Sequence, residues 1–370
     1  MKITRIGEAK VIVSNPMSKH NFFGWPTVAR LQNGKIAVVS SGFRMKHLCP
    51  FGKTVISYSE NEGETYTAPS PVIDTPLDDR DGGILAFGES GVIVTSFNNV
   101  VECQRDFIHS SSFEDSYNNY VLSYLDTVTK EEEEKYYGAT FRVSYDCGVT
   151  FGELHKSPVT SPHGPIQLKN GNILWVGRIT EPDRDTVGDF IASFIIDPDG
   201  KGAEYLGRIP DVYDEGEKMI CCEAHVAELE GGTLICHFRV QSSNDVHTQR
   251  LYSVYQSVSD DGGKSWSEPE RLIDKKGGYP PFLCKHSSGA LISVYSRTRG
   301  ILPYGILAMV SLDGGKSWST EHLLSPLSSL DLGYPSTVEL RDGTLITVFY
   351  SKSSTDSSSV ILQQKWSIDL

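Results

Sequence analysis

The sequence predicts an all-β protein, a six-bladed β-propeller that forms one domain over residues 1–370. Three observations predict this fold. An apolar hairpin segment occurs six times, and a motif with Asp and Gly at fixed spacing occurs three times and once more with Asn in place of Asp. The chain also contains 34 Gly, 18 Pro and 17 Tyr. Repeats of about 50 residues are typical of propellers, in which each repeat forms one four-stranded blade.

Each hairpin segment consists of an apolar stretch, a turn that contains Gly, and a second apolar stretch. Turns such as Asn33-Gly34, Asn170-Gly171 and Asp342-Gly343 favour tight β-hairpins. The intervals between copies are 55 to 60 residues, except for one of 82. The six copies begin near Trp25, Asp81, His163, Glu223, Tyr279 and Tyr334. We therefore expect these hairpins to form six blades.

The second motif reads Ser-x-Asp-x-Gly-x-Ser/Thr-aromatic. It occurs at 144–151, 259–266 and 311–318, and in a weaker form with Asn at 59–66. The Asp can accept hydrogen bonds from backbone N–H groups of its own turn, and Gly adopts a backbone conformation that other residues avoid. We therefore expect structural turns without a catalytic role.

The two ends of the chain are expected to meet in one blade. The last repeat begins at Tyr334 and has only 37 residues, too few for a complete blade with its loops. Residues Lys2 to Val13 precede the first hairpin and have no partner in their own blade. We expect this N-terminal strand to complete the last blade and close the ring. In the long interval, the charged run Glu131 to Lys135 is expected to be a solvated surface loop.

Composition and motifs exclude several classes of partner. A formal net charge of −13 and a pI near 5.3 argue against a nucleic-acid partner. The sequence has no stretch long enough to span a membrane and no secretory signal, so we expect a cytoplasmic protein. Seven Cys without a CxxC array fit reduced thiols. We expect no metal and no cofactor.

Strand direction predicts a polar cup at one end of the axis. The first strand of each hairpin starts at this end and the second strand returns to it. The strand starts contribute Trp25, Arg80, Asp81, His163, Glu223, Tyr279 and Tyr334. The strand ends contribute Arg44, Arg178, Arg239 and Arg297, followed in the first repeat by Lys46 and His47.

A cationic cup of this kind suits an oxygen-rich or anionic ligand. Arg presents a planar fork that matches a carboxylate, and the aromatic residues Trp25, Tyr279 and Tyr334 offer faces on which a sugar ring can stack. Alternatively, these residues form ion pairs, such as Arg239 with Glu223 or Arg80 with Asp79.

From about Phe22 to Tyr350, the repeats and the Ser-x-Asp-x-Gly motif resemble the sialidase (neuraminidase) superfamily, whose Asp boxes (BNR repeats) have this form. The resemblance implies a propeller with the boxes between the outer strands of its blades. It also implies that Tyr334, in Gly333-Tyr334-Pro335-Ser336, is a nucleophile that Glu223 activates. Arg239 and Arg297 are then ligands of a substrate carboxylate. Because a Tyr has a free pKa near 10, it needs a carboxylate that accepts its proton.

The sequence departs from the family pattern at two places. Phe23-Gly24-Trp25-Pro26 stands where sialidases have an aromatic-Arg-Ile-Pro motif, so the first Arg of the triad is absent. The stretch Gly42 to Gly52, where the acid/base Asp is expected, contains no Asp or Glu. His47 is our candidate for that role, although it could equally be a loop residue without a function. Asp81 is the second candidate, because carboxylates as close as Asp79 and Asp81 can separate their pKa values.

Three functions follow from these observations. The first is a sialidase-like glycoside hydrolase that removes a terminal sugar, such as an acidic one, from an oligosaccharide. The second is a polysaccharide lyase acting at a uronate, with Tyr334 or His47 as its base. The third is a non-catalytic propeller that binds carbohydrate or protein.

Overall fold

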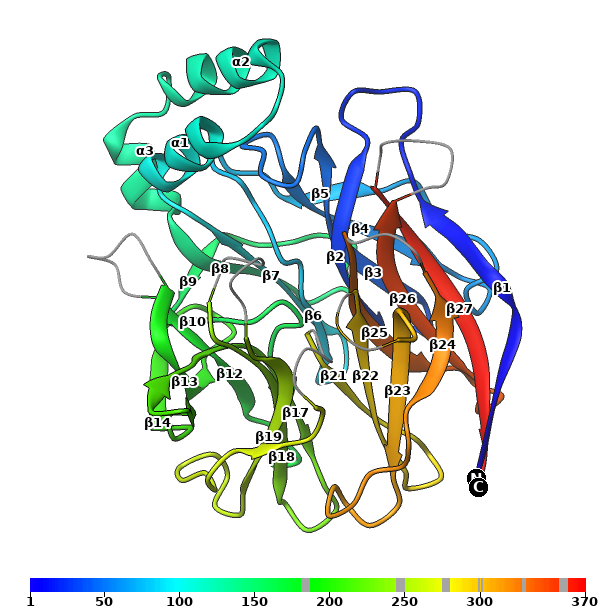
Figure 1. Ribbon diagram of the computed structural model, residues 1–370. Coiled ribbons are helices and arrows are strands. Elements are labelled where there is room, and N and C mark those ends of the chain that lie inside the picture. Colours follow the sequence, from blue (N-terminus) through cyan, green and yellow to red (C-terminus); the bar gives the residue numbers. More distant parts are fainter. Residues whose placement is uncertain are drawn as a thin grey trace.

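The protein is described by a computed structural model over residues 1–180, 187–243, 250–274, 280–298, 300, 302–327, 331–352 and 359–370. Within these residues, six antiparallel sheets are arranged as the blades of a propeller (Figure 1), which confirms the predicted fold. In each blade, the strand order runs outward from an inner hairpin near the axis.

The strands of the first three blades are as follows. Blade 1 contains β2 (Phe22–Arg30), β3 (Ile36–Arg44), β4 (Lys53–Ser59) and β5 (Ser70–Ile73). Blade 2 contains β6 (Ile84–Phe87), β7 (Gly91–Asn98), β8 (Gly138–Ser144) and β9 (His155–Ser157). Blade 3 contains β10 (Val159–Thr160), β11 (Ile166–Gln167), β12 (Ile173–Thr180), β13 (Val187–Ile196) and β14 (Ala203–Arg208).

The remaining blades follow the same plan. Blade 4 contains β17 (Ile220–Glu228), β18 (Leu234–Gln241), β19 (Tyr252–Ser259) and β20 (Glu270–Arg271), after a small hairpin of β15 (Tyr213–Asp214) and β16 (Glu217–Lys218). Blade 5 contains β21 (Phe282–Lys285), β22 (Leu291–Arg297), β23 (Gly305–Ser311) and β24 (His322–Pro326). Blade 6 contains β25 (Leu332–Glu339), β26 (Leu345–Lys352), β27 (Ser359–Asp369) and β1 (Lys2–Val13).

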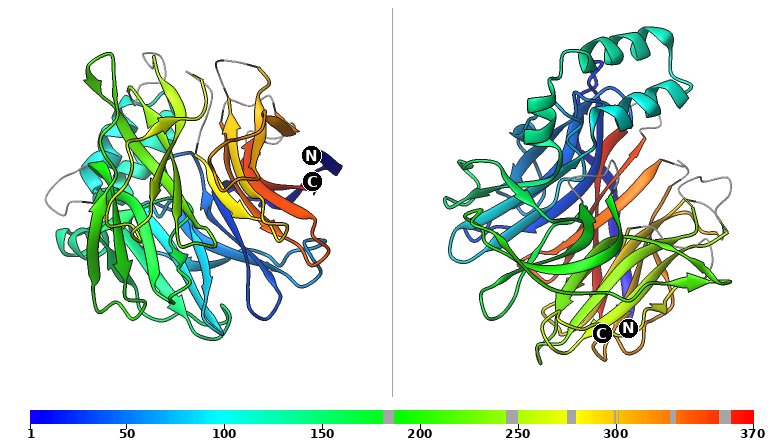
Figure 2. Two further views of the ribbon diagram at one scale, coloured as in Figure 1. Left: turned by 90° about the horizontal axis from the view of Figure 1, so that it is seen from below. Right: turned by 90° about the vertical axis from the view of Figure 1, so that its left-hand side faces the viewer.

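Both ends of the chain lie in blade 6, as predicted. Strand β1 pairs antiparallel with β27, from Lys2 opposite Asp369 to Val13 opposite Ile361. The two termini are therefore neighbours (Figures 1 and 2). This pairing closes the ring without leaving β27 as an exposed edge.

Blade 3 differs from the predicted four-stranded pattern because its inner strand is in two pieces. Strands β10 and β11 both pair with β12, and residues 161–165 between them are not in a strand. This interruption contains Pro162 and Pro165. Proline has no N–H to donate to the ladder, so the inner strand is broken at this point.

The long interval in blade 2 is a helical insertion and not the loop that we expected. It contains α1 (Val101–Ser110), α2 (Asp115–Leu125) and α3 (Lys130–Tyr136) between β7 and β8 (Figure 1). Helix α3 includes the charged run and buries no residue. The run is therefore exposed to solvent, as predicted, but it is a helix and not a loop. It begins with a capping box, in which Thr129 Oγ1 accepts from the Glu132 N–H and Glu132 Oε2 accepts from the Thr129 N–H. None of the helices in the described ranges is long and apolar enough to cross a membrane.

The helical insertion packs onto the loop that follows β3 and onto the segment that follows β5. The Tyr117 hydroxyl donates to the Leu48 carbonyl at 2.7 Å, and the Tyr124 hydroxyl donates to the Pro76 carbonyl at 2.9 Å. The ring of Phe51 stacks on that of Tyr120, with centroids 5.0 Å apart. Helix α2 therefore fixes the loop 45–52, which carries His47.

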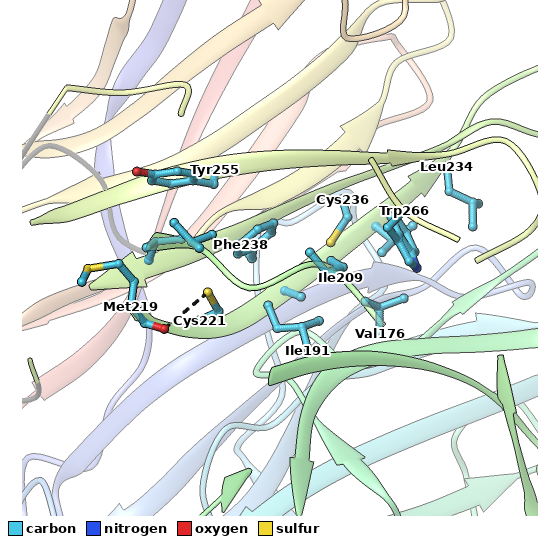
Figure 3. Packing of buried hydrophobic residues seen from close by; sticks show 14 of the residues in the cluster. Val176, Ile191, Ile209, Met219, Cys221, Leu234, Cys236, Phe238, Tyr255 and Trp266 are labelled. Carbon is cyan, nitrogen blue, oxygen red and sulfur yellow. Dashed lines mark hydrogen bonds between the residues drawn. The ribbon is translucent and has the colours of Figure 1, made fainter. Parts of the chain in front are cut away.

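Neighbouring blades are held together by apolar side chains. Figure 3 shows the contact between blades 3 and 4, where Val176 and Ile191 pack with Phe238 and with Trp266 of an Asp box. The indole N–H of Trp266 also donates to Ser193 Oγ of blade 3 at 3.3 Å. An Asp box thus links its own blade to the preceding one.

The Asp boxes have the geometry of structural turns. Asp261 Oδ1 accepts from the backbone N–H groups of Lys264 at 3.1 Å and Ser265 at 2.8 Å, and Oδ2 accepts from the Ser265 hydroxyl at 2.6 Å. These hydrogen bonds lower the pKa of Asp261 to about 2. The boxes around Asp146 and Asp313 repeat this arrangement.

We expect Asp261→Ala to lower the melting temperature by a few degrees at neutral pH, because the turn loses acceptors for two N–H groups and one hydroxyl. A carboxylate with a lowered pKa stabilises the fold above its unfolded pKa and loses this effect as the pH falls towards about 2. The difference from the wild type should therefore shrink in acid, as measured by calorimetry at several pH values. Asp261→Asn is the matched control, because Asn61 already fills this position in the first box and accepts from the Thr65 N–H. Identical melting of Asp261→Ala and the wild type would contradict this role.

Candidate active site at the propeller axis

The inner strands place four chemically different side chains at equivalent positions. Trp25, Asp81, Glu223 and Tyr334 stand in blades 1, 2, 4 and 6, and all have left-handed backbone, with φ of 53°, 50°, 57° and 52°. This conformation is costly for residues with a side chain, and it is concentrated at functional sites. In blades 1, 4 and 6, the inner pairing also shifts its register at this position. The same local distortion therefore marks the axial end of these blades.

Tyr334 and Glu223 meet across the axis, although blade 5 separates their blades in the ring. The Tyr334 hydroxyl donates to Glu223 Oε1. Glu223 Oε2 lies 2.8 Å from Arg239 Nη1, which also donates to the Tyr252 hydroxyl at 2.9 Å. The Arg239–Glu223 ion pair that the sequence offered as an alternative is therefore formed. It lies beside the tyrosine, so it does not argue against a functional site.

The surroundings of Tyr334 and Glu223 shift the pKa values of both side chains. Burial raises the pKa of Glu223 to about 7, although Arg239 and the hydrogen bond from Tyr334 favour the ionised form. Burial and the charge of Glu223 raise the pKa of Tyr334 well above its ordinary value. Tyr334 is therefore protonated at neutral pH, and Glu223 is the group in contact with it that can take the proton.

A second group of residues surrounds the Arg80 guanidinium. Arg80 lies 4.5 Å above the Trp25 ring, and its Nη2 is 3.3 Å from Nε2 of His47. Nη1 of Arg80 is 3.5 Å from Asp78, so the ion pair forms with Asp78 and not with Asp79. His47 Nδ1 in turn lies 3.6 Å from Asp331 Oδ1.

Asp81 acts electrostatically on both groups. Burial raises its pKa, and the positive charges of Arg80, Arg44 and Arg239 oppose the rise. Its own negative charge contributes to the raised pKa values of Glu223 and Tyr334. Arg178 is also close enough for its charge to lower the pKa of Glu223. We call this set the axial cluster, which consists of Arg80, Asp81, Arg178, Glu223, Arg239, Tyr334, His47 and Asp331.

Arg44 and Arg297 are not part of the axial cluster, which corrects the prediction that they contact a ligand. Arg44 is completely buried and pairs with Asp78 at 2.5 Å. Arg297 is only 2% exposed and pairs with Glu321. The blades can be aligned on their hairpin turns, which have the same backbone hydrogen bonds. In this alignment, Ser41 of blade 1 and Ser296 of blade 5 occupy the position of Arg239 in blade 4. Arg297 lies one residue later, so its side chain points to the other face of the strand.

Trp25 and His163 are also packing residues, which corrects their assignment as sugar ligands. Trp25 is 1% exposed, and the guanidinium groups of Arg80 and Arg44 lie over its ring at 4.5 and 5.0 Å. His163 is equally buried, with Nδ1 3.1 Å from Thr27 Oγ1 and its ring edge-on to Phe282. A sugar ring cannot stack on either residue. Tyr279 lies outside the described residues.

Sequence reasoning missed three residues of the site. Tyr350 pairs with Gly333 in the register in which Arg239 pairs with Cys222, so the repeat itself could have identified it. Its hydroxyl donates to Asp331 at 2.9 Å. Asp331 precedes β25, and Tyr252 opens a third strand, so neither falls at a position that the hairpin repeat marks.

Two further features bear on ligands. In the described ranges, no group of three or more His, Cys, Asp or Glu side chains could hold a metal ion. A cavity of about 1150 Å³ lies between the helical insertion and blades 2 and 3, with Arg105, Lys156 and Phe194 among its lining residues. It includes no residue of the axial cluster.

Comparisons with known proteins agree with this architecture. A model of the BNR repeat-like domain family matches residues 112–347, which is more than half of the chain. No curated protein sequence matches significantly. A Dyadobacter fermentans protein of unknown function has a similar structure, with a TM-score of 0.74, 19% identity and 99% coverage of both chains.

Two sialidase structures share the fold. The NanB sialidase of Streptococcus pneumoniae has a TM-score of 0.66 and 12% identity, over 98% of this chain and 71% of that one. The Trypanosoma rangeli sialidase has a TM-score of 0.59 and 14% identity, over 99% of this chain and 59% of that one. Because the family model matches more than half of the residues, this chain belongs to the family of BNR repeat-like domains.

Proposed function

We propose that this protein is a glycoside hydrolase that removes a terminal sugar carrying an acidic group, with Tyr334 as its nucleophile. The observation that carries this proposal is the contact of the Tyr334 hydroxyl with Glu223, which Arg239 holds from the other side. Tyr334 is partly buried, and a Tyr nucleophile needs a neighbouring carboxylate that accepts its proton.

In the first step, the Tyr334 oxygen bonds to the anomeric carbon while Glu223 Oε1 takes the phenolic proton. The bond from the anomeric carbon to the leaving oxygen breaks, and an acid protonates that oxygen. In the second step, water attacks the same carbon, and the acid of the first step, now a base, takes a proton from that water. The bond to Tyr334 breaks, and Glu223 returns the proton to the phenol oxygen. Proton transfers of this kind contribute about 10² to 10⁴ in rate each.

The remaining charges of the axial cluster fit this chemistry. Arg239 and Arg178 are the cations that act on Glu223, and a guanidinium matches a substrate carboxylate in two-point contact. His47, whose side chain is 42% exposed, is the proton donor to the leaving oxygen in this proposal. Asp81 raises the pKa of Glu223 and so tunes the base.

A screen of terminal α- and β-glycosides, including sialic acid and uronate analogues, tests the proposal. The expected result is release of a reducing sugar from an anionic glycoside, with a neutral glycoside of the same linkage as the control. If the folded protein releases no sugar from either the anionic or the neutral glycosides, the hydrolase proposal is wrong. The non-catalytic binding propeller would then be the better explanation.

A polysaccharide lyase is the second candidate, and one observation favours it. Nε2 of His47 lies 3.3 Å from the Arg80 guanidinium, so a base stands next to a cation that could neutralise a uronate carboxylate. A lyase forms an unsaturated product that absorbs in the ultraviolet, whereas a hydrolase does not. The same screen, followed by ultraviolet absorbance, therefore separates the two reactions.

The raised pKa of Glu223 predicts the pH dependence of the activity. Only the ionised carboxylate can accept the phenolic proton, and its pKa is about 7. We expect kcat/KM to fall about tenfold per pH unit below about pH 7, because this constant reports on groups of the free enzyme. Measurement of kcat/KM from about pH 5 to about pH 9 checks this limb.

A stability measurement checks the same pKa without a substrate. A carboxyl group whose folded pKa is raised stabilises the fold fully below its unfolded value of 4.5, and it loses this effect as the pH rises towards about 7. Relative to Glu223→Gln, the wild type should therefore lose stability over that range. A stability difference that does not change with pH would contradict the raised pKa.

A further inference from the structure

The backbone that carries His47 is held from two sides. The His47 carbonyl oxygen accepts from Arg44 Nη2 at 2.8 Å and from Arg80 Nη1 at 3.3 Å. On the next residue, the Leu48 carbonyl accepts from the Tyr117 hydroxyl of α2. A loop fixed in this way positions its side chain more accurately than a free loop does.

The neighbours of the His47 ring determine which nitrogen carries the proton. Nε2 lies 3.3 Å from Arg80 Nη2, and a guanidinium donates hydrogen bonds but accepts none. Nε2 of the neutral ring must therefore be the acceptor, so the proton is on Nδ1. Nδ1 faces Asp331 Oδ1 at 3.6 Å, and the Trp25 ring packs edge-on against the imidazole with centroids 5.0 Å apart.

Asp331 is suited to hold this tautomer. Its carboxylate also accepts from the Tyr350 hydroxyl at 2.9 Å, which fixes its orientation. Burial acts to raise the pKa of Asp331, but the contacts with His47 and Tyr350 and the charge of Lys352 outweigh it and hold the pKa below its ordinary value. Asp331 is therefore ionised at neutral pH.

We propose that Asp331 is a positioning residue that holds His47 in the Nδ1–H form, and that the two act as an acid–base pair in place of the carboxylate absent from Gly42 to Gly52. This inference rests on the proposed hydrolase function. A carboxylate that orients a histidine and stabilises its imidazolium is a known arrangement in hydrolytic enzymes.

In the reaction, the protonated His47 gives its Nε2 proton to the leaving oxygen as the glycosidic bond breaks. The neutral ring that remains has its proton on Nδ1, facing Asp331. In the second step, Nε2 takes a proton from the attacking water, which regenerates the imidazolium. Arg80 contacts Nε2 in the neutral state, so it must make way for the leaving group or for water.

The tautomer is measured on the full-length protein without a substrate. Nitrogen NMR with isotope-labelled histidine is expected to show a protonated Nδ1 and an unprotonated Nε2 for the neutral ring of His47. Asp331→Ala should reduce this preference but not abolish it, because Arg80 still lies within hydrogen-bond distance of Nε2. Asp126→Ala is the matched control, because it removes an exposed carboxylate that pairs with Arg105 in the helical insertion, and it should leave the tautomer unchanged. An Nε2–H ring in the wild type, or an unchanged ring in Asp331→Ala, would overturn the proposal.

Kinetics with a substrate from the glycoside screen give the second readout. Asp331→Asn keeps an oxygen that can accept from Nδ1–H but loses the charge, so kcat should fall about 10- to 100-fold while KM changes less than about twofold. Asp331→Ala should fall further. A kcat equal to that of the wild type in Asp331→Ala would refute the role. Failure of the hydrolase proposal is seen separately, as absent turnover in a protein that has the expected tautomer.

Discussion

Tyr334→Phe is expected to lower kcat by at least about a thousandfold, because the substitution removes the oxygen that attacks the anomeric carbon. The ring remains, so the packing against Trp25 and Tyr350, with ring centroids at 6.4 and 6.1 Å, should be kept. The measurement is the initial rate of sugar release, on protein whose melting temperature matches that of the wild type.

Glu223→Gln should reduce kcat by a similar factor, because the amide cannot accept the phenolic proton. The two residues act on the same step, so the double variant should be little slower than either single variant. Tyr255→Phe is the control and should keep its activity. Tyr255 belongs to the core between blades 3 and 4, and its hydroxyl accepts from Arg271. Full activity in Tyr334→Phe would show that another group is the nucleophile, or that the cluster only binds its ligand.

Most of the fold could be predicted because the same hairpin segment is repeated six times in the sequence. Each hairpin turn has its own Gly signal, and six turns, with four of the five intervals nearly equal, determine the blades and the strand direction. The helical insertion was missed, although its signals are present in the sequence. Thr129 and Glu132 form a capping-box pattern, and Tyr117, Val121 and Leu125 recur at helical spacing and are all buried in α2.

The hairpin repeat located the residues of the candidate site only to within about one position along each strand. An error of one position places a side chain on the wrong face of the strand. Arg239 lies near the end of β18 and Arg297 ends β22, but their side chains occupy opposite faces, because Ser296 is the residue in register with Arg239. Trp25 shares its backbone conformation with Glu223 and Tyr334, yet it is buried under two arginines. Burial of this kind depends on neighbouring blades, which the repeat does not encode.

The other large effect is expected from the buried pair of Arg44 and Asp78. Both side chains are 0% exposed, and Asp78 Oδ2 also accepts from the Cys49 N–H at 3.1 Å. Arg44→Met removes the cation and leaves the Asp78 carboxylate with less compensation in a buried place. Breaking a buried pair on one side costs about 3 to 5 kcal/mol. Urea unfolding, followed by tryptophan fluorescence, measures the loss.

An exposed ion pair serves as the matched control, because it shows how much stability is lost when a pair is broken without burial. Arg105 and Asp126 are in contact at 2.6 Å, but their side chains are 31% and 69% exposed. Arg105→Met should therefore cost less than about 1 kcal/mol, because exposed ion pairs contribute little. Equal losses in the two variants would contradict the argument from burial. If the argument holds, Arg44→Met also loses the hydrogen bond to the His47 carbonyl, so its kcat should fall at a temperature where the variant is still folded. The arginine that sequence reasoning assigned to substrate binding would then affect the reaction through the loop that it supports.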